Sequence, residues 1–566
     1  MTYRAPLTDI AHALKVAGLD ALLDTGAFAD VDRDTVMAVL QGAAQFTEGV
    51  LAPLNRSGDQ EGVRLENGQV RTATGFADAW KQYAAGGWTG LSADPKFGGQ
   101  GLPKVLALAA FEMAHAANMS FALCPLLGEG AIHLLSLHGT KRQQEIYLKK
   151  LVAGAWTGTM NLTEPQAGSD LALVRCKAEP DGDAYRITGQ KIFITYGDHD
   201  MADNIVHLVL ARLPDAPPGV KGISLFLVPK ILVGDDGKLG AANAVRPLSL
   251  EKKLGIHASP TCVMGYEGAK GEIVGKPGDG LALMFLMMNS ARLNVGMEGV
   301  GVAEAATQKA LSYARERKQG RSPWTKDAPA AIFDLPDVRR MLMLMTAKTQ
   351  AARAICYATA IASDMAEHAQ SDHARQSAAL REDVLVPIAK AWSTDMAVEV
   401  ASLGVQVHGG AGFIEETGAA QFYRDARIMP IYEGTNGIQA MDLAGRKLGL
   451  ENGKAVRDLL IEMRSAAIAD KPLSATLHEA IAACERATDW MLANKGTANA
   501  LGAATAYLKL MGDTVGGFLL AKGADSGARQ ALARFYAAQV LKPALGLADT
   551  IETGAAGLEA ADIFGG

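Results

Sequence analysis

The sequence has few cysteines and no concentrated positive charge, and each shortage excludes a class of function. Five cysteines are spread over 566 residues without a C-x-x-C pair, which argues against a disulfide framework and against a Cys-ligated zinc site. They are Cys124, Cys176, Cys262, Cys356 and Cys484. The formal net charge is −6 and no long basic run occurs. Because phosphate binding needs clustered Lys and Arg, nucleic acid is not an expected partner.

Common catalytic signatures are also absent. The sequence contains no G-x-S-x-G elbow, no phosphate-binding G-x-x-x-x-G-K loop and no H-E-x-x-H zinc motif. "GMEGVG" at 296–301 resembles a dinucleotide fingerprint, but no strand pattern precedes it, so its glycines are expected to let helices pack closely. His368, Asp372 and His373 have a spacing that could hold a metal, yet the polar stretch around them indicates a solvated face. No metal site is predicted.

Targeting and membrane-spanning segments are not evident either. The first twenty residues lack the apolar core of a secretory signal, and apolar runs such as "LALMFLMM" (281–288) are too short to cross a bilayer. We therefore expect a cytoplasmic protein with no membrane partner.

The pattern of residues changes three times along the chain, which predicts a mainly α fold with a central β-barrel. Residues 1–158 read as an N-terminal helical domain, with a capping Asp at the start of the helix that begins near residue 32. Residues 159–280 hold short β-branched runs separated by turn signals, which predicts antiparallel strands in a small barrel. Helical periodicity returns in a bundle at 281–450, and residues 451–566 form an additional Ala-rich helical segment with glycine breaks near 496, 516 and 523.

An isolated carboxylate lies in "MPIYEGTNGIQAM", residues 429–441. Glu433 stands in an apolar loop with no basic residue nearby in sequence. Desolvation raises the pKa of an acid, and such a glutamate can transfer protons. The alternative is an acid beside the start of a helix that Thr435 or Asn436 caps.

Two further stretches carry features of a cofactor site. "NLTEPQAGSDLAL" (161–173) contains a turn of small residues at 167–170, whose backbone N–H groups suit an anion such as a pyrophosphate. In "GQKIFITYG" (189–197), Phe193 and Thr195 are two residues apart and therefore face the same side of a strand. An aromatic ring and a hydroxyl on one face suit the edge of a heteroaromatic ring, although an ordinary half-buried strand would look the same.

Five motifs, "LTEPQAGSD", "GQKIFIT", "ARERKQG", "VQVHGGAGF" and "IYEGTNGIQ", occur here in the order and at the separations seen in acyl-CoA dehydrogenases. The resemblance covers about residues 35–448. The long C-terminal tail is similar to the bacterial branch that includes 3-methylmercaptopropionyl-CoA dehydrogenases. This resemblance implies a helical N-domain, a β-barrel and a four-helix bundle with FAD between barrel and bundle. It also implies an acyl-CoA substrate, electron-transfer flavoprotein as acceptor and a homodimer or homotetramer.

Residue roles follow from the same resemblance, by position. Glu433 matches the catalytic base, which takes the α-proton while hydride passes from the β-carbon to flavin N5, giving a trans-2-enoyl-CoA. Positions that match substrate contacts are Ser169, Asn289 and Arg292. Positions that match cofactor contacts are Leu162, Thr163, Gly168, Ser169, Phe193, Thr195, Arg317, Gln406, Gly410, Thr435 and Gly437, with Arg317 reaching the FAD of a neighbouring subunit.

Some positions depart from the family pattern, and some alternatives stay open. "ERKQGRS" lacks the usual Phe, Gln421 replaces a basic residue and Asn289 replaces an acidic one. Leu, Phe and Met crowd residues 281–296, which favours a short or medium acyl chain such as 3-methylthiopropionyl, provided these side chains do not face the core instead. An acyl-CoA oxidase would share the fold and base. A flavin-bearing DNA-binding scaffold is disfavoured, because residues 451–566 hold eleven Lys/Arg against thirteen Asp/Glu.

Overall fold

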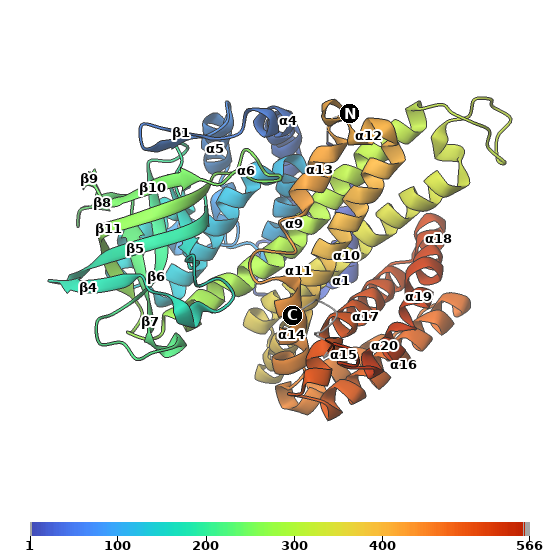
Figure 1. Ribbon diagram of the computed structural model, residues 1–566. Helices are drawn as coiled ribbons and strands as arrows, with labels where there is room; N and C mark the ends of the chain where they lie inside the picture. Colours follow the sequence, from blue (N-terminus) through green and yellow to red (C-terminus); the bar gives the residue numbers. More distant parts are fainter. Residues whose placement is uncertain (1–2, 559, 561–566) are drawn as a thin grey trace.

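The computed structural model describes residues 3–558 and 560. A β-barrel lies beside a bundle of long helices, the N-terminal helices pack across both, and the C-terminal segment covers the far side of the bundle (Figure 1). The predicted fold class is confirmed. The division into four domains stays a prediction, and its first boundary, 158/159, falls inside a strand.

The N-terminal part consists mainly of helices. They are α1 (Leu7–Ala17), α2 (Leu19–Leu23), α3 (Arg33–Phe46), α4 (Ala52–Glu61), α5 (Phe76–Ala85), α6 (Lys104–His138), α7 (Lys141–Gln143) and α8 (Lys149–Val152), with a small hairpin of β1 (Arg64–Glu66) and β2 (Gln69–Arg71). The capping prediction is confirmed, because the Asp32 carboxylate accepts the backbone N–H of Thr35 at 2.7 Å at the start of α3.

Helix α6 differs from the expectation that no apolar run could cross a membrane. Its length and composition would allow a crossing, but 72% of its most apolar window is buried in the protein. The helix also bends at Asn118, whose φ of −161° is not helical. A helix that is apolar on all sides is expected in the centre of a large core, and α6 lies there, between the barrel and the long helices.

The central domain is a closed barrel. Its strands are β3 (Trp156–Asn161), β4 (Lys177–Asp181), β5 (Ala184–Thr195), β6 (Asn204–Arg212), β7 (Ile223–Pro229), β10 (Val245–Leu250) and β11 (Thr261–Val274), beside a hairpin of β8 (Ile231–Val233) and β9 (Leu239–Ala242). The ring closes because β7 pairs with both β6 and β11, while β11 continues through β5 and β4 back to β6. Closure leaves no free edge within this ring.

The expectation of purely antiparallel strands is wrong at one side of the barrel. Strand β3 pairs with β6 in parallel over Trp156–Asn161, and β4 meets β6 in parallel at one residue pair. Short-range sequence signals mark hairpins, whereas a parallel pair joins strands separated by a long connection. The connection from β3 to β6 carries two other strands.

The bundle is built from α9 (Gly280–Glu316), α10 (Pro336–His368) and α11 (Asp372–His408), followed by the short helices α12 (Gly410–Phe413), α13 (Ala419–Ala426) and α14 (Asn436–Asp442). The "GMEGVG" glycines lie inside α9, and they bring helices together as predicted. An ideal Cβ on Gly296 would lie 2.6 Å from the carbonyl O of Ala389 in α11, and one on Gly299 would lie 2.7 Å from that of Ser393. The α9–α11 crossing is therefore too close for side chains at these positions.

The C-terminal segment forms helices α15 (Lys454–Ser465), α16 (Lys471–Ala493), α17 (Ala498–Lys522), α18 (Gly527–Tyr536), α19 (Lys542–Ala544) and α20 (Leu547–Glu552). It docks on the bundle, because α17 packs against α10 and α11 and the indole N–H of Trp392 donates to Asp513 at 2.9 Å. The predicted break at Gly516 is wrong. Helix α17 runs through this residue, whose small size admits the Tyr536 hydroxyl 2.9 Å from an ideal Cβ.

Candidate active site

Glu433 lies in the loop between α13 and α14, which runs along the side of the bundle that faces the barrel (Figure 1). Its φ is +55°, in the left-handed region that non-glycine residues seldom adopt, and Gly434 follows at +82°. Thr435 then caps α14 by accepting the N–H of Ile438 at 3.3 Å. Thr435, one of the two cap candidates named from the sequence, is therefore the cap, and the acid beside it has a strained backbone.

Two helices hold the loop, one at the residue before Glu433 and one at residues after it. From α11, the Lys390 ammonium donates to the carbonyl O of Gly434 and to Oδ1 of Asn436, both at 2.9 Å. From α9, Oε2 of the Glu298 carboxyl group accepts a hydrogen bond from the hydroxyl of Tyr432. The residues on both sides of Glu433 are thereby fixed to the long helices.

The surroundings of Glu433 favour a proton-transfer role. Its side chain is half-buried, and burial raises its pKa above the ordinary value, while the cations of Arg292 and Lys390 lower it in part. Within residues 3–558, no side chain hydrogen-bonds to its carboxylate. The carboxylate can therefore accept a proton from a ligand.

Arg292 is closely connected to this acid. Arg292 is 5% exposed, and its guanidinium lies 3.8 Å from the Asp442 carboxylate and donates to Oδ1 of Asn289 at 3.4 Å. An ideal Cβ on Gly434 would lie 3.7 Å from its Nη2. The structure thus brings Arg292, a predicted substrate contact, to the loop of Glu433.

On the barrel, a buried ion pair holds two predicted cofactor segments together. Nζ of Lys191 in β5 donates to Glu164 Oε1 at 2.8 Å and to the carbonyl O of Leu162 at 2.9 Å, and the N–H of Ile192 donates to the carbonyl O of Thr163 at 2.9 Å. Burial alone would raise the pKa of Glu164, but Lys191 and two backbone N–H groups lower it, so the carboxyl is ionised. Leu162 and Thr163 therefore lie beside the end of β5.

The exposed part of this region suits a flavin and its phosphates. Phe193 has a φ of +61° and is 60% exposed, whereas Ile194, which follows it, is buried. Thr195 is half-buried, and Gly168 and Ser169 lie in an exposed loop where an ideal Cβ on Gly168 would meet no atom. An exposed ring, nearby hydroxyls and a small-residue loop fit a heteroaromatic group with a phosphate.

Three other predicted cofactor residues lie elsewhere. Arg317 caps the C-terminal end of α9, Gln406 lies in the last turn of α11 and Gly410 begins α12 (Figure 1). All three are exposed, at the end of the bundle away from α14. Their roles at the cofactor, including the reach of Arg317 to a neighbouring subunit, stay predictions. Thr435 and Gly437, in contrast, are exposed close to Glu433.

One cavity has a volume of about 660 Å³ and includes the predicted substrate residue Asn289. The apolar part of its wall comes from Leu286 and Leu293 of α9 and from Leu108 and Ile132 of α6. The methionines of 281–296 do not line it. Those at 284, 287 and 288 are buried in the core beside the barrel, so the alternative that these side chains face the core holds for them.

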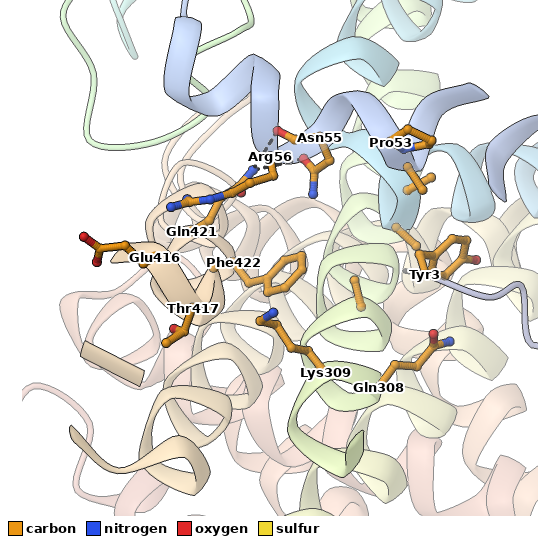
Figure 2. Close-up of a pocket in the computed structure, with 15 residues that line it drawn as sticks. Tyr3, Pro53, Asn55, Arg56, Gln308, Lys309, Glu416, Thr417, Gln421 and Phe422 are labelled. Atoms are coloured by element: carbon orange, nitrogen blue, oxygen red, sulfur yellow. Dashed lines mark hydrogen bonds between the residues drawn. The ribbon is translucent and has the colours of Figure 1, made fainter. Parts of the chain in front are cut away.

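Another cavity, of about 420 Å³, lies between α4, α9 and α13 (Figure 2). Its wall includes Gln421, where the family usually has a basic residue, and Gln421 donates to Oδ1 of Asn55 at 3.0 Å. Positive charge comes instead from Arg56 and Lys309. None of the predicted catalytic, cofactor or substrate residues lines this cavity.

Sequence reasoning missed Glu298 and Lys390. Each is a single charge in an apolar or glycine-rich run, "GMEGVG" and "VLVPIAKAW", and each is fully buried. Burial raises the pKa of Glu298 to about 8 and lowers that of Lys390 to about 8. The isolation that singled out Glu433 was thus also present at both positions.

Family models match four consecutive parts of the chain. Three describe the N-terminal, middle and C-terminal domains of acyl-CoA dehydrogenase, at residues 34–155, 159–268 and 278–448. The fourth, "Acetyl-CoA dehydrogenase C-terminal like", matches residues 459–562, within the segment that packs on the bundle.

Similar proteins extend over nearly the whole chain. A 3-methylmercaptopropionyl-CoA dehydrogenase from Ruegeria pomeroyi is 47% identical over 96% of both chains. A butyryl-CoA dehydrogenase from Syntrophomonas wolfei is 35% identical over 79% of this chain and 75% of its own. The solved acyl-CoA dehydrogenase from Bacillus anthracis, complexed with FAD, has a TM-score of 0.75 and 21% identity, over 92% of this chain and 88% of its own. The chain therefore belongs to the acyl-CoA dehydrogenase family, and it is an FAD-dependent enzyme that acts on acyl-CoA.

Proposed function

We propose that Glu433 is the base that removes the α-proton of the acyl-CoA thioester as it is oxidised to a trans-2-enoyl-CoA. The observation that carries this proposal is the held geometry of the residue: a left-handed backbone, fixed on both sides, with a free carboxylate whose pKa burial raises. A thioester α-proton is weakly acidic, so its base must be close, oriented and poorly hydrated. Arg292 and Lys390 limit the rise in pKa, which leaves the carboxylate available to accept the proton.

The cofactor surface of each subunit is proposed to combine residues of the barrel with the start of α14. In this arrangement FAD is held by Leu162, Thr163, Gly168, Ser169, Phe193, Thr195, Thr435 and Gly437. The FAD of a neighbouring copy is contacted by Arg317, Gln406 and Gly410. When bound, FAD accepts the hydride that leaves the β-carbon. The support from this chain is the exposed Phe193 ring at the end of β5, next to Ile192, whose N–H donates to the carbonyl O of Thr163 at 2.9 Å.

Replacing Glu433 by Gln tests the base. The variant should keep its fold and bound FAD but lose acyl-CoA-driven flavin reduction by several orders of magnitude, because an amide cannot accept the proton. Glu479→Gln, at an exposed position of α16, is the matched control and should reduce its flavin at the parent rate. Bleaching of Glu433→Gln at near the parent rate would assign the base to another residue.

The substrate is proposed to be a short or medium acyl-CoA, with 3-methylthiopropionyl-CoA as the leading candidate. The support is the 47% identical relative of that specificity, together with a butyryl-CoA dehydrogenase at 35%. Because one methylene in an apolar pocket is worth about 1–3 kcal/mol, neighbouring chain lengths should also turn over. We expect kcat/KM from C4 to C16 to be highest for the methylthio compound or a short chain. A maximum at C12 or longer would contradict the proposal.

Electron-transfer flavoprotein is the proposed acceptor, and an oxidase is the alternative. The match to family models of dehydrogenases favours the first. Turnover with an artificial dye under nitrogen, compared with peroxide formation in air, separates the two. Peroxide produced at the rate of dye reduction would identify an oxidase.

A homodimer or homotetramer is the proposed assembly. Phe413 of α12 is 84% exposed and its neighbour Ile414 is 50% exposed, and Phe413 lies at the other end of the short helix that Gly410 begins. Exposed apolar side chains of this size are common at interfaces between subunits. Light scattering of the holoenzyme should give two or four chains, and Phe413→Glu should lower that number. A monomeric parent protein would exclude this arrangement.

A further inference from the structure

Glu298 is a buried acid that the proton-transfer step does not use. It lies in α9, its side chain is 0% exposed, and Oε2 accepts the hydroxyl of Tyr432. Its other oxygen, Oε1, has no hydrogen-bond partner among the described residues. A carboxyl group held in the core at such a desolvation cost calls for a specific role.

The partner of Glu298 identifies that role. Tyr432 directly precedes Glu433, so the hydrogen bond fixes the backbone that enters the left-handed residue. On the other side, Lys390 holds the carbonyl O of Gly434 at 2.9 Å. Each contact constrains one neighbour of Glu433, and together they prevent the loop from relaxing to an ordinary φ.

Both anchors come from one rigid part of the fold. Glu298 lies between Gly296 and Gly299 in α9, and Lys390 lies between Ala389 and Ser393 in α11. These are the residues at which the two backbones approach each other too closely for a Cβ. Because neither helix can shift there without a clash, the positions of both side chains are well determined.

We propose that Glu298 is a positioning residue of this active site, which acts through Tyr432 to hold Glu433 in its catalytic geometry. The inference rests on the proposed role of Glu433 as the base. Glu298 does not exchange protons with the substrate.

The electrostatics of the cluster agree with this role. The ionisable groups that face Glu298 are Tyr432 and Glu433 in the loop and Lys390 in α11, and burial raises its pKa to about 8. At neutral pH the carboxyl is mainly protonated, so it accepts the Tyr432 hydrogen bond without a second negative charge beside the base. An amide at this position could accept the same bond.

Rapid-mixing measurements of flavin reduction by butyryl-CoA test the proposal in the holoenzyme. Glu298→Ala should lower the limiting reduction rate by about 10- to 100-fold, the range expected for a base displaced by about 1 Å, while the apparent Kd changes less than about threefold. Glu298→Gln should restore the rate to within about threefold of the parent. Tyr432→Phe should lose as much as Glu298→Ala, and the double variant should lose no more than either, because both remove one interaction.

Glu304→Gln is the matched control. This glutamate lies further along α9 and pairs with Arg353 at 2.8 Å rather than with the loop, so its loss should affect thermal stability without slowing reduction. A parent-like rate in Tyr432→Phe, which needs no buried cavity to fold, would overturn the proposal, and so would additive losses. If Glu433→Gln fails to reduce its flavin while Glu298→Ala reduces it at the parent rate, only the positioning role of Glu298 is refuted. If Glu433→Gln reduces its flavin normally, both assignments fail.

Discussion

Replacing Gly434 by Ala should slow the reaction without removing any catalytic group. Gly434 has a φ of +82°, and an ideal Cβ there would lie 2.8 Å from Nε2 of Gln439. That amide donates to the carbonyl oxygens of Glu433 and Gly434 at 3.5 and 3.3 Å. The extra methyl group therefore strains the backbone and displaces one of the side chains that hold the loop.

The magnitude follows from these contacts. The left-handed conformation costs an alanine about 1–2 kcal/mol, and loss of the two long hydrogen bonds adds about 1 kcal/mol. If the loop escapes this strain by leaving the left-handed region, a penalty of about 2–3 kcal/mol lowers the population with Glu433 correctly placed by about 30- to 160-fold. The limiting rate of flavin reduction should fall by the same factor.

The assay is flavin reduction by saturating butyryl-CoA, with FAD content and apparent Kd measured in parallel. Gly445→Ala is the control, because an ideal Cβ there meets no atom and the residue lies in the helical turn Leu443–Lys447. The control should keep the parent rate and gain slightly in stability. A parent-like rate in Gly434→Ala would refute the argument that the left-handed loop positions the base.

Three further perturbations have signed outcomes. Burial raises the pKa of Glu298 from an ordinary 4.5 to about 8. Between these pH values the folded chain keeps a proton that the unfolded chain has released. The free energy of unfolding that this proton contributes is fully present below pH 4.5 and is lost as the pH rises through 8. Glu298→Gln should therefore flatten the decline of thermal stability across this window, and an unchanged slope would contradict the burial effect. Lys390→Met removes a charge that lowers the pKa of Glu433, so the acidic limb of the reduction rate should move to higher pH; no movement would show that the ammonium does not act on the base. Asp513→Ala leaves the Trp392 N–H without its acceptor, at a cost of about 1–3 kcal/mol. Limited proteolysis near residue 450 should therefore be faster than in the control Asp549→Ala, which changes an exposed residue. Equal cleavage rates would exclude this contact as a main support of the docked segment.

The sequence determined the family, the class of each segment and the candidate base, because these depend on short-range features. Motifs in fixed order, the change of hydrophobic period and the turn signals are all visible without a fold. Glu433 stood out because no nearby residue in sequence could neutralise it. Thr435 was recognisable as a candidate cap because it stands just before the apolar run that forms α14. The cap at Asp32 and the glycines of 296–301 were also predicted correctly.

Only the tertiary structure decided which residues surround that base. Glu298 is 134 residues from Tyr432, and Lys390 is 44 residues from Gly434, so no local pattern could link them to Glu433. The parallel strand β3, the uninterrupted helix at Gly516 and the core-facing methionines likewise depend on partners distant in sequence. The left-handed φ of Glu433 could not be predicted from its residue type either, because side-chain propensity favours glycine there and the contacts of Tyr432 and Gly434 to two helices override it. Propensity acts over a few residues, whereas burial and the positions of charges are set when distant segments pack.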